Sequence, residues 1–155
     1  MFVLQKKSFR WIVYALLIAA LLVFSALYAL GGSSVTHPTP YVDDHLLDVT
    51  DSSLIINLSE VRLVQYADTG SMEPLLFEGA TGIEVPVNSF KDLHVGDIVS
   101  YQADWIEGLV THRIVAQEQD GEGMYYTLKG DANSADDLGM VRFSQIKFKL
   151  IGVLY

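Results

Sequence analysis

The sequence predicts a mainly β domain, built as a barrel or a sandwich, behind one N-terminal transmembrane helix. One long uncharged run lies near the N-terminus, and short apolar or alternating segments separated by turn residues fill most of the remaining chain. None of these segments carries the pattern of a long amphipathic helix. Many short strands without such helices are typical of barrels and sandwiches.

Composition narrows the classes of function. Half of the 155 residues are apolar, which is enough for one compact domain after the membrane segment. There is no cysteine, which excludes disulfides, thiolate metal sites and a cysteine nucleophile. The net charge of -9 disfavours binding to nucleic acid, because nothing offsets repulsion from phosphate. His37, His45 and His94 lack the spacing of metal ligands, and we expect no metal or other cofactor.

Residues 11–30 form the expected transmembrane helix. The run carries no charge, and at helical rise it spans about 30 Å, the thickness of the hydrocarbon core. Residues 1–10 contain several basic side chains, whereas no Lys or Arg follows the run until Arg62. This asymmetry predicts a cytoplasmic N-terminus and an extracytoplasmic domain. A cleaved signal peptide is the alternative, but the run exceeds the roughly 7–15 apolar residues usual in such peptides.

The chain after this run divides into a tether and a domain. Residues 31–52 are the expected tether, in which Pro38 and Pro40 disfavour helix and favour extended backbone. Residues 53–155 are the expected β-rich domain, with a short helical turn over residues 71–76. The strands we expect in it cover residues 54–58, 61–66, 82–87, 97–101, 109–115, 124–128 and 148–154.

Ser71 is the first residue with candidate chemistry. It follows Gly70, which permits a tight backbone, and precedes Pro74, which favours the first turn of a helix. Backbone N–H groups at such a turn suit an oxyanion. Taken alone, the same local pattern is more typical of a serine that only caps a short helix.

His112 and a group of aspartates complete the candidate set. On its expected strand, His112 shares a face with apolar neighbours, as a core histidine or as a general base near neutral pH. Asp131, Asp136 and Asp137 follow the next expected strand, where aspartates are ordinary turn formers. One of them could accept a hydrogen bond from the histidine, and the pattern does not select which. Asp97 is most simply a turn residue.

A serine hydroxyl needs a base to accept its proton and a third group to orient that base. The chain offers one good candidate for each role, namely Ser71, His112 and the aspartate cluster, all downstream of the uncharged run. This order suggests a membrane-anchored serine hydrolase.

Four segments, in order between residues 61 and 153, resemble the signal peptidase I family in its endoplasmic-reticulum and archaeal-type branch. Residues 70–74 are similar to the nucleophile segment, and residues 95–101 to the strand that follows it. Residues 110–114 are similar to the segment that holds the base, and residues 129–137 to the third conserved segment. Each is weak alone, and the ordered set is specific.

The resemblance implies a role for each site residue. Ser71 would be the nucleophile, and His112 the general base where the main bacterial branch uses a lysine. Asp137 matches the position that orients the histidine, and Asp131 a second acidic position of less defined role. Thr69 stands where the family often has serine and is a candidate donor to the oxyanion.

The resemblance further implies a membrane-bound endopeptidase that removes signal peptides from exported preproteins after small residues. We expect a single-pass protein of the plasma membrane, or of the endoplasmic-reticulum membrane in a eukaryote. Its partners would be preprotein signal peptides, the lipid bilayer and possible accessory membrane subunits. The alternatives are a dedicated peptidase for a narrow client set, such as pilin or matrix subunits, and a non-catalytic membrane-anchored β-domain. A self-cleaving repressor-type protease is disfavoured, because those pair serine with lysine.

Overall fold

The computed structural model describes Tyr14, residues 16–23 and residues 37–155. The chain divides into two units, residues 1–35 and residues 36–155. In the first unit, the described residues are helical and exposed. None of the helices in the described part of the chain is long and apolar enough to cross a membrane. The expected cytoplasmic residues and much of the expected transmembrane run lie outside the described residues.

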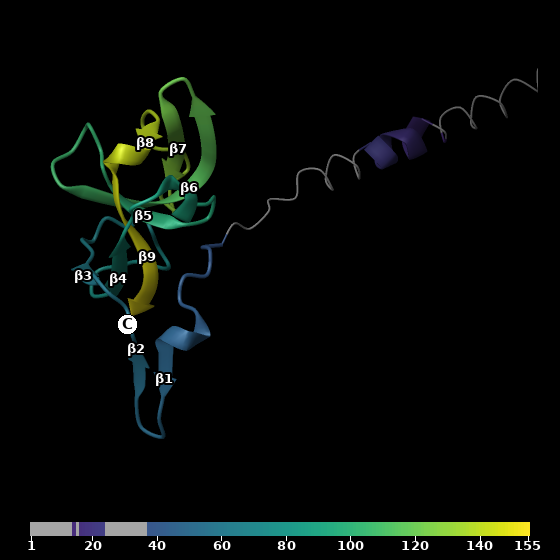
Figure 1. The fold of residues 1–155 in the computed structure, drawn as a ribbon. Coiled ribbons are helices and arrows are strands. Elements are labelled where there is room, and N and C mark those ends of the chain that lie inside the picture. Colours follow the sequence, from purple (N-terminus) through teal and green to yellow (C-terminus); the bar gives the residue numbers. More distant parts are fainter. Residues whose placement is uncertain (1–13, 15, 24–36) are drawn as a thin grey trace, which may run out of the picture. The chain divides into compact units, whose positions relative to one another are not determined.

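The second unit is mainly β, as the sequence predicts (Figure 1). A two-stranded sheet pairs β1 (Leu47–Val49) with β2 (Leu54–Ile56). A seven-stranded antiparallel sheet has the order β3-β4-β9-β5-β6-β7-β8. Its strands are β3 (Arg62–Gln65), β4 (Thr81–Pro86), β5 (Ile98–Gln102), β6 (Leu109–Asp120), β7 (Gly123–Lys129), β8 (Val141–Arg142) and β9 (Ile146–Leu154). The short 3-10 helices are η1 (Asp44–Leu46), η2 (Phe90–Asp92) and η3 (Phe143–Gln145).

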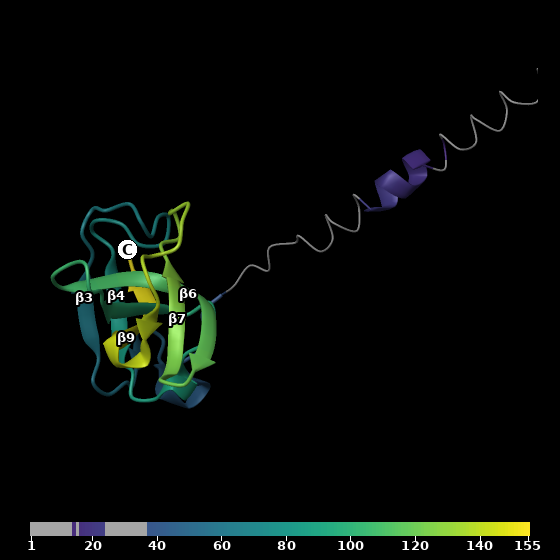
Figure 2. The same cartoon turned by 90° about the horizontal axis from the view of Figure 1, so that it is seen from above.

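The large sheet curves around its core when it is seen from above (Figure 2). Its pairing register shifts between Ile83 and Glu84 on β4, and between Ser100 and Tyr101 on β5. A further shift lies on β6, just after Ile114. Irregularities of this kind bend a strand and increase its twist, so they allow the sheet to curl. The last strand, β9, lies between β4 and β5 and joins the two halves of the sheet.

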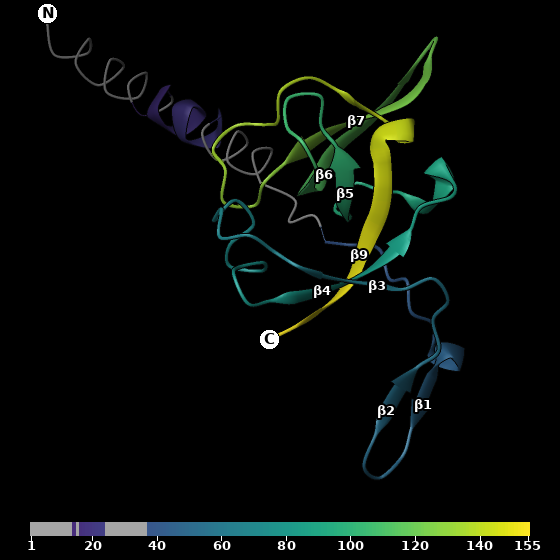
Figure 3. The same ribbon diagram turned by 90° about the vertical axis from the view of Figure 1, so that its left-hand side faces the viewer.

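The β1–β2 hairpin projects away from the large sheet (Figures 1 and 3). Leu47 pairs with Ile56 and Val49 with Leu54, which puts these four side chains on one exposed face of the hairpin. The turn is closed by the backbone N–H of Ser53, which donates to Thr50 Oγ1 at 3.1 Å. The sequence pattern indicates only the second strand of this hairpin.

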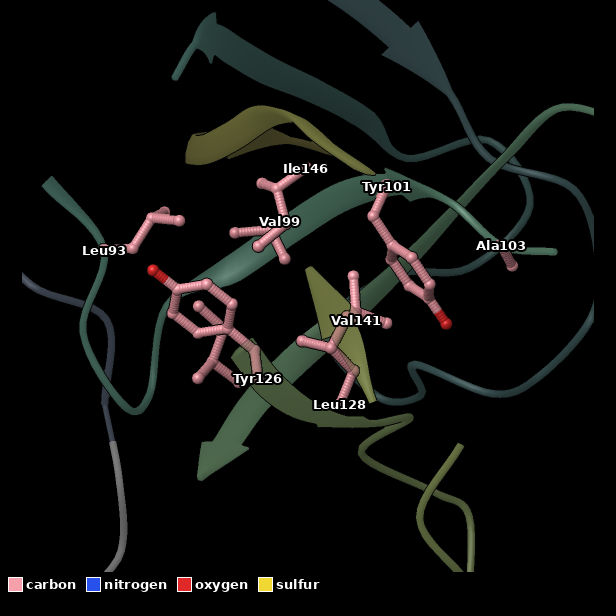
Figure 4. Close-up of a cluster of buried hydrophobic side chains, with 9 residues drawn as sticks. Leu93, Val99, Tyr101, Ala103, Tyr126, Leu128, Val141 and Ile146 are labelled. Carbon is pink, nitrogen blue, oxygen red and sulfur yellow. The ribbon is translucent and has the colours of Figure 1, made fainter. Parts of the chain in front are cut away.

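Two clusters of buried side chains form the core. The larger cluster lies between β5, β6, β7 and β9 (Figure 4) and comprises Leu93, Val99, Tyr101, Ala103, Ile114, Tyr126, Leu128, Val141 and Ile146. The smaller cluster comprises Met72, Leu76, Ile98 and Leu150. Met72 directly follows Ser71 in the chain, so burial of its side chain fixes the backbone at the candidate nucleophile.

Asp97 has a larger role than that of a turn residue. It does follow a turn, but its side chain is fully buried and forms an ion pair with Lys149 at 2.9 Å. The backbone N–H groups of Thr39 and His94 donate to its two oxygens, at 2.7 and 2.9 Å. Asp97 thus binds a segment almost sixty residues upstream.

Residues around Thr39 lie close against the domain. Gly96 has a φ of 104°, and a Cβ there would lie 2.3 Å from the carbonyl oxygen of His37. Only glycine allows both this backbone conformation and this close approach. Lys149 Nζ also lies 5.9 Å from the centre of the Tyr41 ring. The segment from residue 37 to residue 41 is therefore attached to the domain by specific contacts.

Candidate active site

Ser71 lies in a tight loop between β3 and β4. Gly70 precedes it with a φ of 67°, in the left-handed region that glycine adopts readily. The N–H of Leu76 donates to the carbonyl of Met72 at 2.9 Å. This bond closes one helical turn within residues 71–76, as the sequence predicts, and the turn does not continue into a regular helix.

His112 projects from β6 toward the buried face of the large sheet. Its side chain is 7% exposed, and it shares this face with the fully buried Ile114, as strand alternation predicts. Its Nε2 atom lies 3.1 Å from Ser71 Oγ, and its Nδ1 atom lies 2.6 Å from Asp137 Oδ2. The two ring nitrogens therefore contact the candidate nucleophile and one aspartate.

Asp137 is the aspartate that contacts His112. Its backbone N–H donates to the carbonyl of Leu128 at 2.8 Å, which holds the loop after β7 against the strand, and its side chain is 6% exposed. The hydroxyl of Tyr101 donates to the same oxygen that contacts His112, at 2.8 Å. The neighbouring Asp136 is exposed.

Asp131 binds an arginine instead of the histidine. Its two carboxylate oxygens accept hydrogen bonds from Arg113 Nε and Nη2, at 2.7 and 2.6 Å. Arg113 Nη1 also donates to the carbonyl of Gly96 at 2.7 Å. Because Arg113 directly follows His112, this bidentate pair fastens the loop after β7 to the strand that carries the histidine.

The same loop also touches the backbone of Ser71. The N–H of Ala132 donates to the Ser71 carbonyl at 2.9 Å. A Cβ on Gly130 would lie 2.6 Å from that carbonyl oxygen and 2.6 Å from the Asn133 amide nitrogen. A glycine is therefore required for the loop to approach the serine this closely.

Thr69 lies beside the serine and is exposed. Its Oγ1 atom is 3.2 Å from Ser71 Oγ, and either hydroxyl can donate in this contact. A threonine hydroxyl here is thus available next to the atom that would attack a carbonyl.

Tyr101 was not singled out from the sequence. It pairs with Val110 on β6 and lies on the same face as His112, among apolar residues. Burial, followed by its hydrogen bond to Asp137, raises the pKa of Tyr101, so its hydroxyl remains a donor. A tyrosine at a buried strand position usually has a hydrogen-bond partner, and this was the available signal. Within the described residues, no group of three or more His, Asp or Glu side chains could hold a metal.

No protein-family model matches the chain. Over 84 residues, or 54% of its length, it is 31% identical to signal peptidase I W of Bacillus subtilis (strain 168), and this match covers 44% of that protein. Over 72 residues, or 46% of its length, it is 33% identical to the signal peptidase complex catalytic subunit SEC11 of Scheffersomyces stipitis, of which 42% is covered. The match thus spans less than half the length of each curated relative.

The protein is thus a mainly β domain in which Ser71 contacts His112 and His112 contacts Asp137. Serine hydrolases have the same spatial arrangement of serine, histidine and aspartate. One relative is named a signal peptidase I and the other the catalytic subunit of a signal peptidase complex, so about half of the chain is similar to signal peptidases.

Proposed function

We propose that this protein is a serine endopeptidase that removes signal peptides from exported preproteins. One observation carries the proposal: Ser71 Oγ, the His112 ring and the Asp137 carboxylate form one continuous chain of contacts, at 3.1 and 2.6 Å. The names of the two relatives support the substrate class.

In the proposed reaction, His112 accepts the hydroxyl proton of Ser71 on Nε2 while Oγ attacks the scissile carbonyl carbon. The tetrahedral intermediate collapses to an acyl-enzyme, and His112 gives its proton to the departing amine of the mature protein. Water then attacks the ester and transfers a proton to the same nitrogen. Hydrolysis releases the signal peptide and restores the serine hydroxyl.

Two neighbours would support these steps. Asp137 accepts a hydrogen bond from the Nδ1–H group of His112, which fixes the tautomer whose Nε2 is free, and its negative charge stabilises the imidazolium. Thr69 can turn its hydroxyl from Ser71 toward the oxyanion, since the two oxygens lie only 3.2 Å apart. Asp131 has neither role in this proposal, because its carboxylate is bound to Arg113.

The proposed setting is a membrane surface. A membrane segment over residues 11–30 would keep the domain in the same bilayer as the hydrophobic segment of its substrate. Sharing a membrane raises effective concentration without any new contact. Accessory membrane subunits are part of the proposal, since one relative is named as a subunit of a complex.

The test is cleavage of a preprotein that carries an Ala-x-Ala site, with the full-length protein in detergent. The wild-type protein should cleave at that site, and Ser71→Ala and His112→Ala should each abolish cleavage while the domain stays folded. Activity should also fall in acid, because an imidazolium cannot accept the serine proton. Cleavage by Ser71→Ala at the wild-type rate would exclude the proposed nucleophile. A folded wild-type protein that binds the preprotein without cutting it would favour the non-catalytic alternative.

A further inference from the structure

We propose that Tyr101 is a positioning residue of this site, whose hydroxyl holds the Asp137 carboxylate and through it sets the proton affinity of His112. The catalytic meaning of this inference rests on the function proposed above. No hydrogen bond joins Tyr101 to Ser71 in the described residues, so Tyr101 would act only through the aspartate.

The geometry places two donors on one oxygen. Asp137 Oδ2 lies 2.8 Å from the Tyr101 hydroxyl and 2.6 Å from His112 Nδ1. The tyrosine is 1% exposed on β5, and the aspartate side chain is 6% exposed. A buried carboxylate needs such donors to remain ionised. With two donors at fixed positions, the carboxylate plane has little freedom to rotate.

The hydroxyl also draws negative charge away from the oxygen that His112 contacts. Its own proton is firmly held, because burial and then the Asp137 contact raise the pKa of Tyr101. The tyrosine therefore stays a neutral donor while the histidine titrates. Without it, the whole charge of Oδ2 would act on the imidazole, and the imidazolium would be more stable.

Other charged side chains lie on the elements that surround the His112 ring. Arg113 on β6 is paired with Asp131 of the loop, so their charges largely cancel. Lys129 ends β7, and Asp136 is exposed to solvent. On the serine side, the uncharged Ser71 hydroxyl faces the ring.

Tyr126 provides a matched control. It lies in the same buried cluster and is 0% exposed, and the two rings point their hydroxyl groups in different directions (Figure 4). Its hydroxyl is buried without a hydrogen-bond partner in the described structure. Tyr126→Phe and Tyr101→Phe therefore make the same chemical change in the same core, and only Tyr101→Phe removes a contact to Asp137.

The experiment follows the His112 ring by NMR as pH is varied, on the full-length protein in detergent, and measures cleavage of the same preprotein across pH. Tyr101→Phe should move both the His112 midpoint and the acid limb of kcat/KM about half a unit to higher pH. It should lower kcat roughly 3- to 10-fold, with KM unchanged. Tyr126→Phe should change none of these quantities.

The two readouts separate this inference from the proposed function. A shifted His112 midpoint in Tyr101→Phe alone would support the positioning role even if no preprotein were cleaved. Equal midpoints in Tyr101→Phe and the wild-type protein would overturn it, even for an active peptidase. The same shift in both tyrosine variants would also overturn it, because the effect would then reflect the core in general.

Discussion

At the scale of single residues, the contrast between two adjacent aspartates is the sharpest feature of the site. Asp137 is buried against His112, whereas Asp136 is exposed. Asp137→Asn should lower kcat/KM roughly a thousandfold or more, because an amide can donate to Nδ1 and stabilise the wrong tautomer. Asp136→Asn should remain within about twofold of the wild-type value. Preprotein cleavage kinetics test this, and equal losses in both variants would exclude Asp137 as the orienting group.

Thr69 offers a second prediction at this scale. Its hydroxyl lies 3.2 Å from Ser71 Oγ, and valine has the same shape without a donor. Thr69→Val should lower kcat roughly ten- to a hundredfold with little change in KM, as expected for loss of an oxyanion donor at an exposed site. Thr69→Ser keeps the hydroxyl and should retain most of the activity. If both variants were equally active, the threonine would not contribute to the reaction.

At the scale of elements, the loop after β7 organises the site. It carries Asp137 to the histidine, binds Arg113 through Asp131, and packs against the Ser71 carbonyl at Gly130. Three separate contacts thus tie one loop to the strand that holds the base and to the turn that holds the nucleophile. The loop contains no helix or strand. These contacts therefore fix its position, as strand pairing would in a sheet.

Gly130→Ala tests that arrangement. A Cβ 2.6 Å from the Ser71 carbonyl must displace the backbone of one of the two segments. The variant should lose about 1–3 kcal/mol in free energy of unfolding and most of its activity. Gly121→Ala is the control, because no heavy atom lies within 4 Å of a Cβ at that glycine. Denaturant unfolding and cleavage rates measure both effects, and a fully active Gly130→Ala would contradict the close approach.

Most strands of the large sheet could be predicted because each carries its own local signal. Alternation and turn residues mark every strand of that sheet except β8, which is only two residues long. The three-residue strand β1 was missed as well, since Leu47–Val49 is too short to show a period and lies in an acidic segment. Strand β6 extends to Asp120, beyond the apolar run that predicts it, because its outer end pairs with β7 and needs no burial.

The site could be predicted in part for a similar reason. The local patterns made Ser71 and His112 candidates but were also those of a helix cap and a core histidine, whereas Asp137 was selected by resemblance. The contacts of Tyr101 and Gly130 join segments that are distant in the chain. No local pattern records such a contact, so sequence reasoning treated these residues as ordinary strand and turn positions.

At the scale of the whole molecule, the buried ion pair of Asp97 and Lys149 holds residues 37–41 against the large sheet. Asp97→Asn would leave the ammonium group buried without its counter-ion and should lower the free energy of unfolding by about 3–5 kcal/mol. Asp92→Asn is the control, since that side chain is exposed and only its backbone carbonyl contacts Lys149. Urea unfolding of both variants tests the prediction. A loss below about 1 kcal/mol in Asp97→Asn would mean that the pair is not critical.

The attachment of Thr39 to Asp97 also determines where the protein can be shortened for crystallisation or spectroscopy. A form that began after residue 41 would discard the N–H group that donates to Asp97 and the aromatic ring near Lys149. It would leave a carboxylate oxygen and an ammonium group in the interior with fewer partners. A form that began at residue 36 would keep both contacts. The practical start of the folded domain is therefore set by a backbone hydrogen bond, well before its first strand.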